Sequence, residues 1–269
     1  HARQGKFQLV QIETHLGHVY CRQGDRRKAC ELLECAVERG RALAADFPHT
    51  VAYQTQLCES LQAWSEALDG LGEHVAAGSQ RAESSEILRK IDEQSRGNAR
   101  HVALLAENHE AAAWALRQAG RNDTADLAFR RSQHVLEEGR RRFLQAGFLD
   151  AQLAWLLVST SHEDQRQVDR ALDLARRAVA EEPQQGEYHR ILGAALFRAG
   201  RWEASAASLR LAESLQPGGD GFAEFYLAMA ESRLGNNKQA FLWFGQAREW
   251  MAKNRCDAVK LASLAAEAT

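Results

Sequence analysis

The side chains best suited to bind a metal lie near the start of the chain. His15, His18 and Cys21 are spaced at i, i+3 and i+6, and Cys30 and Cys35 follow soon after them. Imidazole and thiolate groups are the ligands that zinc prefers. A free cysteine is also a good small core residue, and the two histidines flank a Leu-Gly pair where helices are expected to pack. We favour this packing interpretation and predict no metal site.

The candidates for catalysis are weaker still. A nucleophilic cysteine needs a positioned histidine and a lowered pKa, and no cysteine here starts a helix beside a glycine-rich turn. The sequence contains no phosphate-binding loop, no Gly-x-Ser-x-Gly and no His-Glu-x-x-His. We therefore predict that the chain is not an enzyme and uses no cofactor.

The most basic segment contains three consecutive arginines, Arg140 to Arg142. Such a cluster can bind nucleic acid, but Glu137 and Glu138 lie within one helical turn and can pair with it. The net charge of the whole chain is only -2, so no overall field attracts nucleic acid or an anionic membrane. We interpret the segment as a solvated helix surface and predict neither kind of partner.

The composition predicts an all-helical protein. Only three prolines occur among 269 residues, strong helix formers dominate, and no segment alternates apolar and polar residues over the length of a strand. No apolar run approaches 18 residues, which argues against a membrane span. Five cysteines without a regular spacing indicate a reducing compartment, and we expect a cytoplasmic protein. The chain begins at His1, so we expect it to be a piece of a longer protein.

A pattern of small residues recurs along the chain and indicates how its helices are positioned. The segment "ILGAALFRAGRWEASAASL" (191–209) aligns without a gap with "YLAMAESRLGNNKQAFLWF" (226–244). Nearer the start, Gly24, Gly72 and Gly120 are spaced 48 residues apart. Small residues at these positions let two antiparallel helices approach closely, and the glycine after the first helix supplies a turn with positive φ.

This pattern resembles the tetratricopeptide repeat, in which a Leu-Gly pair, a large residue, a turn and a small-large-small series are followed by proline. The match extends over two helices in Leu192, Gly193, Leu196, Gly200, Trp202, Ser205, Leu209, Ala212 and Pro217. The resemblance implies a right-handed α-solenoid of about six helix pairs.

The repeats divide into two groups. We expect three long repeats in residues 1–146 and three shorter ones in 147–269, continuous with the first group. First helices are predicted to begin near Phe7, Val51, Arg100, Phe148, Gly186 and Gly221, and second helices near Asp25, Glu73, Arg121, Gln167, Arg201 and Asn236. A last amphipathic helix, 255–267, is predicted to cap the stack.

The finer pattern is similar to the arrays that commonly follow a Ser/Thr protein kinase domain in bacterial, planctomycete-type multidomain proteins. The kinase itself is absent from this chain, which has no glycine-rich loop, no Val-Ala-Ile-Lys and no His-Arg-Asp. The resemblance implies a non-catalytic scaffold that forms the arm of a larger signalling protein. The alternative that it implies is a regulatory array that senses a small ligand or peptide, as in bacterial transcription regulators.

Two sets of residues are candidates for binding a partner in the concave groove of such an array. Trp114 and Trp155 occupy equivalent places, one residue after the small packing position, and either anchor a bound peptide or pack between first helices. Near the end of the chain, Phe222, Phe225 and Met229 share one helix face. This stripe is either a binding surface or is covered by the adjacent helix.

Three arginines accompany the apolar stripe. Arg190, Arg198 and Arg233 are expected along the inner surface of the last two repeats. An apolar and cationic groove suits a protein or peptide segment that carries carboxylates and hydrophobic anchors. We therefore predict partner binding at this end of the array and leave self-association open.

Overall fold

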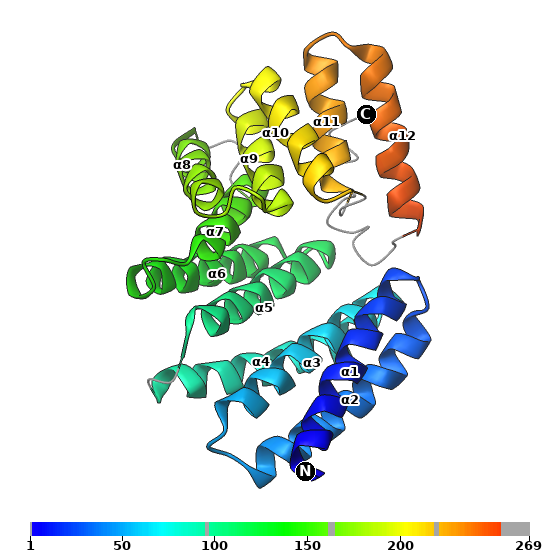
Figure 1. The fold of residues 1–269 in the computed structure, drawn as a ribbon, viewed down its shortest axis with the longest axis vertical. Helices are drawn as coiled ribbons and strands as arrows, with labels where there is room; N and C mark the ends of the chain where they lie inside the picture. Colours follow the sequence, from blue (N-terminus) through cyan, green and yellow to red (C-terminus); the bar gives the residue numbers. More distant parts are fainter. Residues whose placement is uncertain (1, 95–96, 161–164, 218–220, 254–269) are drawn as a thin grey trace. The chain divides into compact units, whose positions relative to one another are not determined.

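The computed structural model describes residues 2–94, 97–160, 165–217 and 221–253 (Figure 1). All regular structure in these ranges is helical, as the composition predicts. The helices are α1 (Ala2–Arg22), α2 (Arg26–Asp46), α3 (Val51–Leu71), α4 (His74–Glu93), α5 (Ala99–Gln118), α6 (Asn122–Arg142), α7 (Gly147–Thr160), α8 (Gln165–Glu181), α9 (Gly186–Arg198), α10 (Trp202–Leu215), α11 (Phe222–Arg233) and α12 (Asn237–Lys253). The predicted helix starts are confirmed within two residues, except that the first helix begins at Ala2 rather than near Phe7. The predicted capping helix lies outside the described residues.

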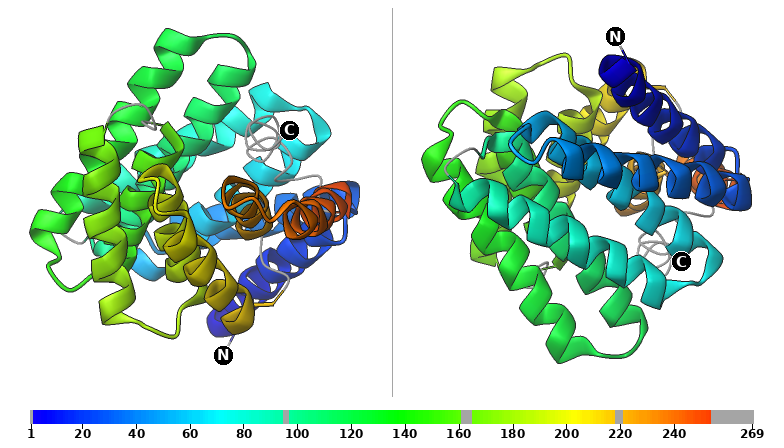
Figure 2. Two further views of the ribbon diagram at one scale, coloured as in Figure 1. Left: turned by 90° about the horizontal axis from the view of Figure 1, so that it is seen from above. Right: turned by 90° about the horizontal axis from the view of Figure 1, so that it is seen from below.

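The chain forms two compact units, 1–135 and 136–269, which divide within α6. The sequence predicts three long repeats up to residue 146 and three shorter ones from residue 147. This division of the repeats is separate from the two units and stays a prediction. In the first unit α1 packs on α2 and α3 on α4, and Figure 2 shows α1 and α2 side by side. In the second unit the packed pairs are α7 with α8, α9 with α10 and α11 with α12.

First helices of neighbouring pairs also touch each other. Within the first unit α3 contacts both α1 and α5, and within the second unit α9 contacts both α7 and α11. Second helices also pack on the first helix of the next pair: α2 on α3, α4 on α5, α8 on α9 and α10 on α11. Within each unit, this arrangement of pairs with touching first helices is the predicted tetratricopeptide-like array.

Small residues are contact points within the pairs α1–α2 and α9–α10. A Cβ added to Gly193 would lie 2.5 Å from Cγ of Leu209 on α10, and one added to Gly17 would clash with Leu33 on α2. Ser205 Oγ donates a hydrogen bond to the Gly193 carbonyl oxygen at 2.7 Å, so this second small position also binds its partner helix. The turn glycines have positive φ, as predicted, at Gly24, Gly72, Gly120, Gly200 and Gly235.

Candidate partner-binding site

The second unit brings three of the predicted binding residues together from three successive first helices. The rings of Trp155 on α7 and Phe222 on α11 meet edge to face, with their centroids 4.9 Å apart. Arg190 extends from the intervening α9, and its guanidinium carbon lies 4.9 Å from the Trp155 ring centre and 5.6 Å from that of Phe222. This geometry allows a cation–π interaction with each ring.

Arg190 also faces a carboxylate on its own helix. Its guanidinium nitrogen lies 3.5 Å from Oε1 of Glu187, one helical turn earlier, and the Glu187 side chain is exposed. The Arg190 side chain itself is only 13% exposed, so the guanidinium lies mostly inside the unit, against the two rings, while the carboxylate of Glu187 faces solvent.

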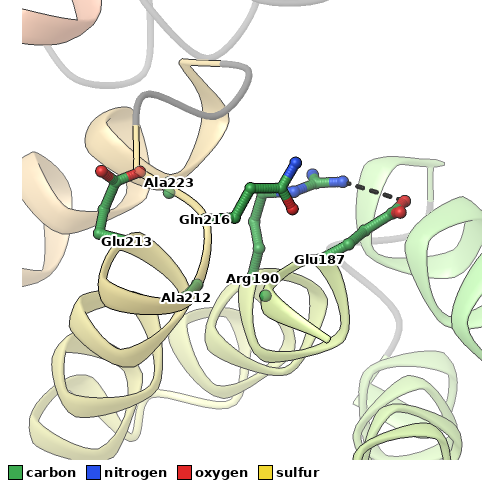
Figure 3. A pocket seen from close by; sticks show the side chains of 7 residues that line it. Glu187, Arg190, Ala212, Glu213, Gln216 and Ala223 are labelled. Carbon is green, nitrogen blue, oxygen red and sulfur yellow. Dashed lines mark hydrogen bonds and ion pairs between the residues drawn. The ribbon is translucent and has the colours of Figure 1, made fainter. Parts of the chain in front are cut away.

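A small cleft adjoins Arg190, with a volume of about 230 Å³ (Figure 3). Its walls come from the start of α9, the end of α10 and the start of α11, and include Glu187, Glu213, Gln216 and Ala223. Gly186 lets α9 begin close to α10, because a Cβ there would lie 2.9 Å from Cβ of Gln216. The cleft thus combines one cation, two carboxylates and an amide on a frame of close helix contacts.

The apolar stripe on α11 is not an exposed surface. Phe222, Phe225 and Met229 are all buried, and Phe225 packs edge-on against Phe244 of α12 at 5.9 Å between ring centroids. Of the two alternatives for this stripe, the structure shows the covered one, since every residue from Phe222 to Glu231 on α11 is buried. The helical pattern placed the three residues on one face correctly, but α11 is covered on its other faces as well.

The other predicted arginines differ in their surroundings. Arg198 is half-buried, and its guanidinium carbon lies 5.8 Å from the ring centre of Tyr226, a residue that the sequence analysis did not select. Arg233 is exposed in the last turn of α11. Of the three predicted arginines, Arg190 is the one whose guanidinium lies over the Trp155 and Phe222 rings.

Trp114 belongs to the first unit and forms a separate cluster there. It packs edge-on against Phe129 at 5.4 Å between ring centroids, and its Nε1 donates a hydrogen bond to Glu110 Oε1 at 3.3 Å. Arg117 lies over both rings. Trp114 and Trp155 occupy equivalent positions in the sequence repeats, and in each unit the tryptophan ring lies beside an arginine.

Several cleft residues were missed from the sequence. Glu187 precedes Arg190 by three residues, and this helical ion-pair spacing was a usable signal. Glu213 and Gln216 lie at the end of α10, the second helix of the same pair, and carry no local pattern that links them to Arg190. Only the packing of α10 beside α9 brings them together.

The early histidine and cysteine cluster forms no metal-ligand set in the structure. Among the described residues, no three His, Cys, Asp or Glu side chains are placed to hold a metal ion, and the lack of a metal stays a prediction. His15 Nδ1 lies 3.0 Å from the Gln11 carbonyl oxygen, and burial lowers the pKa of His18.

Burial also raises the pKa of the Cys58 thiol to about 12, so this group is not a nucleophile at neutral pH. None of the described helices is both long and apolar enough to span a bilayer.

Comparison with known proteins identifies similar folds. No protein-family model matches the chain, and no curated protein matches it in sequence. The crystal structure of BtubC from P. vanneervenii is 15% identical, with a TM-score of 0.54 over 84% of this chain and 91% of that one. PilW, described as a type IV pilus biogenesis factor, is 16% identical, with a TM-score of 0.50 over 90% of this chain and 93% of that one. MamA from Desulfovibrio magneticus RS-1 is 17% identical over 72% of this chain and 95% of that one, with a TM-score of 0.42. The first two likenesses support the helical-repeat fold.

Proposed function

We propose that this chain is a non-catalytic protein-interaction module, a tetratricopeptide-like arm that binds a segment of a partner protein. The observation that carries the proposal is the stack of Trp155, Arg190 and Phe222 on three successive first helices, beside the cleft. First helices line the surface that repeat arrays use for binding. The site therefore lies where the architecture presents ligands.

The chemistry of the site favours a peptide segment with a carboxylate and an apolar anchor. A guanidinium held against aromatic rings binds a carboxylate through charge-assisted hydrogen bonds. Trp155 is only half-buried, so part of its ring remains available to an apolar side chain. Glu213 and Gln216 offer acceptors and a donor to the backbone of a bound segment.

The cleft is less suited to the alternative, a sensor of a small ligand. Pockets for such ligands usually measure about 300–1,000 Å³ and are mostly apolar. The cleft beside Arg190 is smaller, at about 230 Å³, and four of its seven lining residues are polar or charged. Binding of an extended segment that projects beyond the cleft fits these dimensions better.

We further propose that the arm belongs to a larger cytoplasmic signalling protein, such as the kinases whose arrays the sequence resembles. The five cysteines lack the regular spacing of a disulfide framework, which suits a reducing compartment.

Selection from a displayed peptide library tests the proposed function. The intact chain should enrich peptides that combine Asp or Glu with a large apolar residue, and Arg190→Glu should lose them by at least tenfold in affinity. Arg176→Glu is the matched control, because Arg176 is an exposed arginine on the second helix α8. Circular dichroism should show equal helicity for all three proteins. Equal enrichment by Arg190→Glu would overturn the site.

A further inference from the structure

A second cleft in the second unit is lined mainly by arginines, and we call it the basic cleft. It has a volume of about 210 Å³ and is formed by Glu137, Arg140 and Arg141 of α6, by Leu144 just beyond that helix, and by Arg170 of α8. Both α6 and α8 are second helices, whereas the stack of aromatic rings and arginine described above is built on first helices. The basic cleft is therefore a separate candidate site.

The arginines of the basic cleft outnumber the carboxylates that line it. Arg170 Nη2 lies 2.8 Å from Glu137 Oε1, so this ion pair joins α8 to α6 across the cleft. Arg141 pairs with Glu138, three residues earlier on its own helix. Three guanidinium groups but only one carboxylate line the walls, which leaves an excess of two positive charges there.

Asp150 of α7 fixes the position of Arg140. Asp150 Oδ1 accepts a hydrogen bond from Arg140 Nε, and its Oδ2 lies 3.1 Å from Nε of Arg177 on α8. The Arg140 side chain is only 22% exposed, so this contact is largely shielded from water. It engages Nε, while the two terminal nitrogens of a guanidinium carry four further N–H donors. Arg140 is thus a fixed cation with donors left for a ligand in the cleft.

Stabilisation of the end of α6 explains only part of this cluster. Arginines in the last turn of a helix interact favourably with its dipole, which is equivalent to roughly half a negative charge. This accounts for Arg140 and Arg141 but not for Arg170, which lies near the start of α8, where the dipole does not favour a cation. The excess of two positive charges also outweighs the partial charge of the helix end.

We propose that the basic cleft binds the phosphate group of a phosphorylated side chain on a partner protein. A phosphate monoester carries about −1.5 to −2 charges at pH 7 and three acceptor oxygens, which match the charge excess and the three arginines. A carboxylate supplies one charge and two oxygens. The cleft has the volume of about seven liquid water molecules, enough for a phosphate group and a few bridging waters.

Leu144 favours a protein segment as the carrier of the phosphate. Its side chain is 85% exposed and lines the same cleft, so an apolar residue beside the phosphorylated one can pack on it. None of the described lining residues is aromatic, as stacking of single-stranded nucleic-acid bases would favour. The net charge of -2 for the whole chain does not attract it to an anionic membrane.

Fluorescence polarisation of the intact chain with two labelled peptide pools tests this proposal. One pool has a central phosphoserine between randomised residues, and the matched pool has serine at that position. The wild-type chain should bind the phosphorylated pool about tenfold more tightly or better. Arg170→Gln and Arg141→Gln should each lose most of this preference. Arg176→Gln is the matched control, because it removes an exposed arginine from the same helix α8 outside the cleft and should bind like the wild type.

The other sources of a phosphate group are separate arms of the same experiment. Inorganic phosphate that binds the wild-type chain as tightly as the phosphorylated pool would overturn the proposal, and so would tighter binding to phosphatidylcholine vesicles that contain phosphatidic acid. An unchanged preference in both Arg170→Gln and Arg141→Gln would also overturn it. Arg190→Glu, which disables the site proposed above, should keep the wild-type preference for phosphoserine, so the two proposals can fail independently.

Discussion

Gly193 shows how one residue sets the distance between two helices. Replacing Gly193 with Leu drives new atoms into Leu209 across the α9–α10 contact and should lower the free energy of unfolding by about 1–3 kcal/mol or more. Gly78 is the matched control, because it also lies within a helix but a Cβ there meets nothing within 4 Å. Gly78→Leu should raise stability by about 0.5–1 kcal/mol. Chemical denaturation measures both, and equal effects at the two sites would contradict the close packing of α9 on α10.

His101 links the stability of the first unit to pH. Its Nδ1 accepts a hydrogen bond from the Asn98 backbone N–H at 3.2 Å, its backbone N–H donates to Asn98 Oδ1 at 3.1 Å, and its Nε2 lies 2.6 Å from Thr55 Oγ1. Protonation of Nδ1 would break this capping box. Burial lowers the pKa of His101, so the unfolded chain takes up the proton at higher pH than the folded chain does.

Stability should therefore fall as the pH drops through the ordinary histidine pKa of about 6.5. The melting temperature of the His101→Gln variant should fall less between pH 8 and pH 5 than that of the wild type, because glutamine completes a capping box without titrating. Burial also lowers the pKa values of His18 and His109, so part of the dependence should remain in the variant. His49→Gln, at an exposed histidine, should keep the wild-type slope. An unchanged slope for His101→Gln would contradict the role of the cap.

At the scale of the element, α11 acts as the central helix of its repeat. Phe225 is fully buried and packs against Phe244, so Phe225→Ala should destabilise the second unit by about 3–5 kcal/mol. Phe241→Ala removes an equally large but exposed ring on α12, and should change stability by less than about 0.5 kcal/mol in dilute solution. Thermal melts of the two variants compare them directly. Equal melting temperatures would mean that α11 does not pack as the structure describes.

At the scale of the whole molecule, an array of helix pairs should respond locally to damage. Each pair contacts only its neighbours, so its stability depends on adjacent interfaces more than on distant ones. Gly193→Leu should speed amide hydrogen exchange in α9 and α10 by at least tenfold and leave α1 to α4 near their wild-type rates. Uniform acceleration in all described helices would instead show that both units unfold in one cooperative step.

Local features of the sequence determined the helices and their turns. Helix starts such as Val51 and Gly186, and the positive φ of Gly200, follow from short-range patterns of apolar, small and glycine residues. The close contact of Gly193 with Leu209 could also be predicted, because both residues belong to one repeat with fixed spacing. These properties depend on residues within about 20 positions along the chain, and a repeat pattern contains that local information.

The tertiary structure alone decided which surfaces are covered and which side chains meet. Phe225 carries the same apolar pattern whether it is exposed or buried, and only the packing around α11 buries it. Likewise, Trp155 and Phe222 meet beside Arg190 although they are far apart in sequence. The exposed Phe241 of α12 aligns with the buried Ala206 of α10, a helix that packs on α11, so the neighbouring helix and not the residue type decides burial at this repeat position.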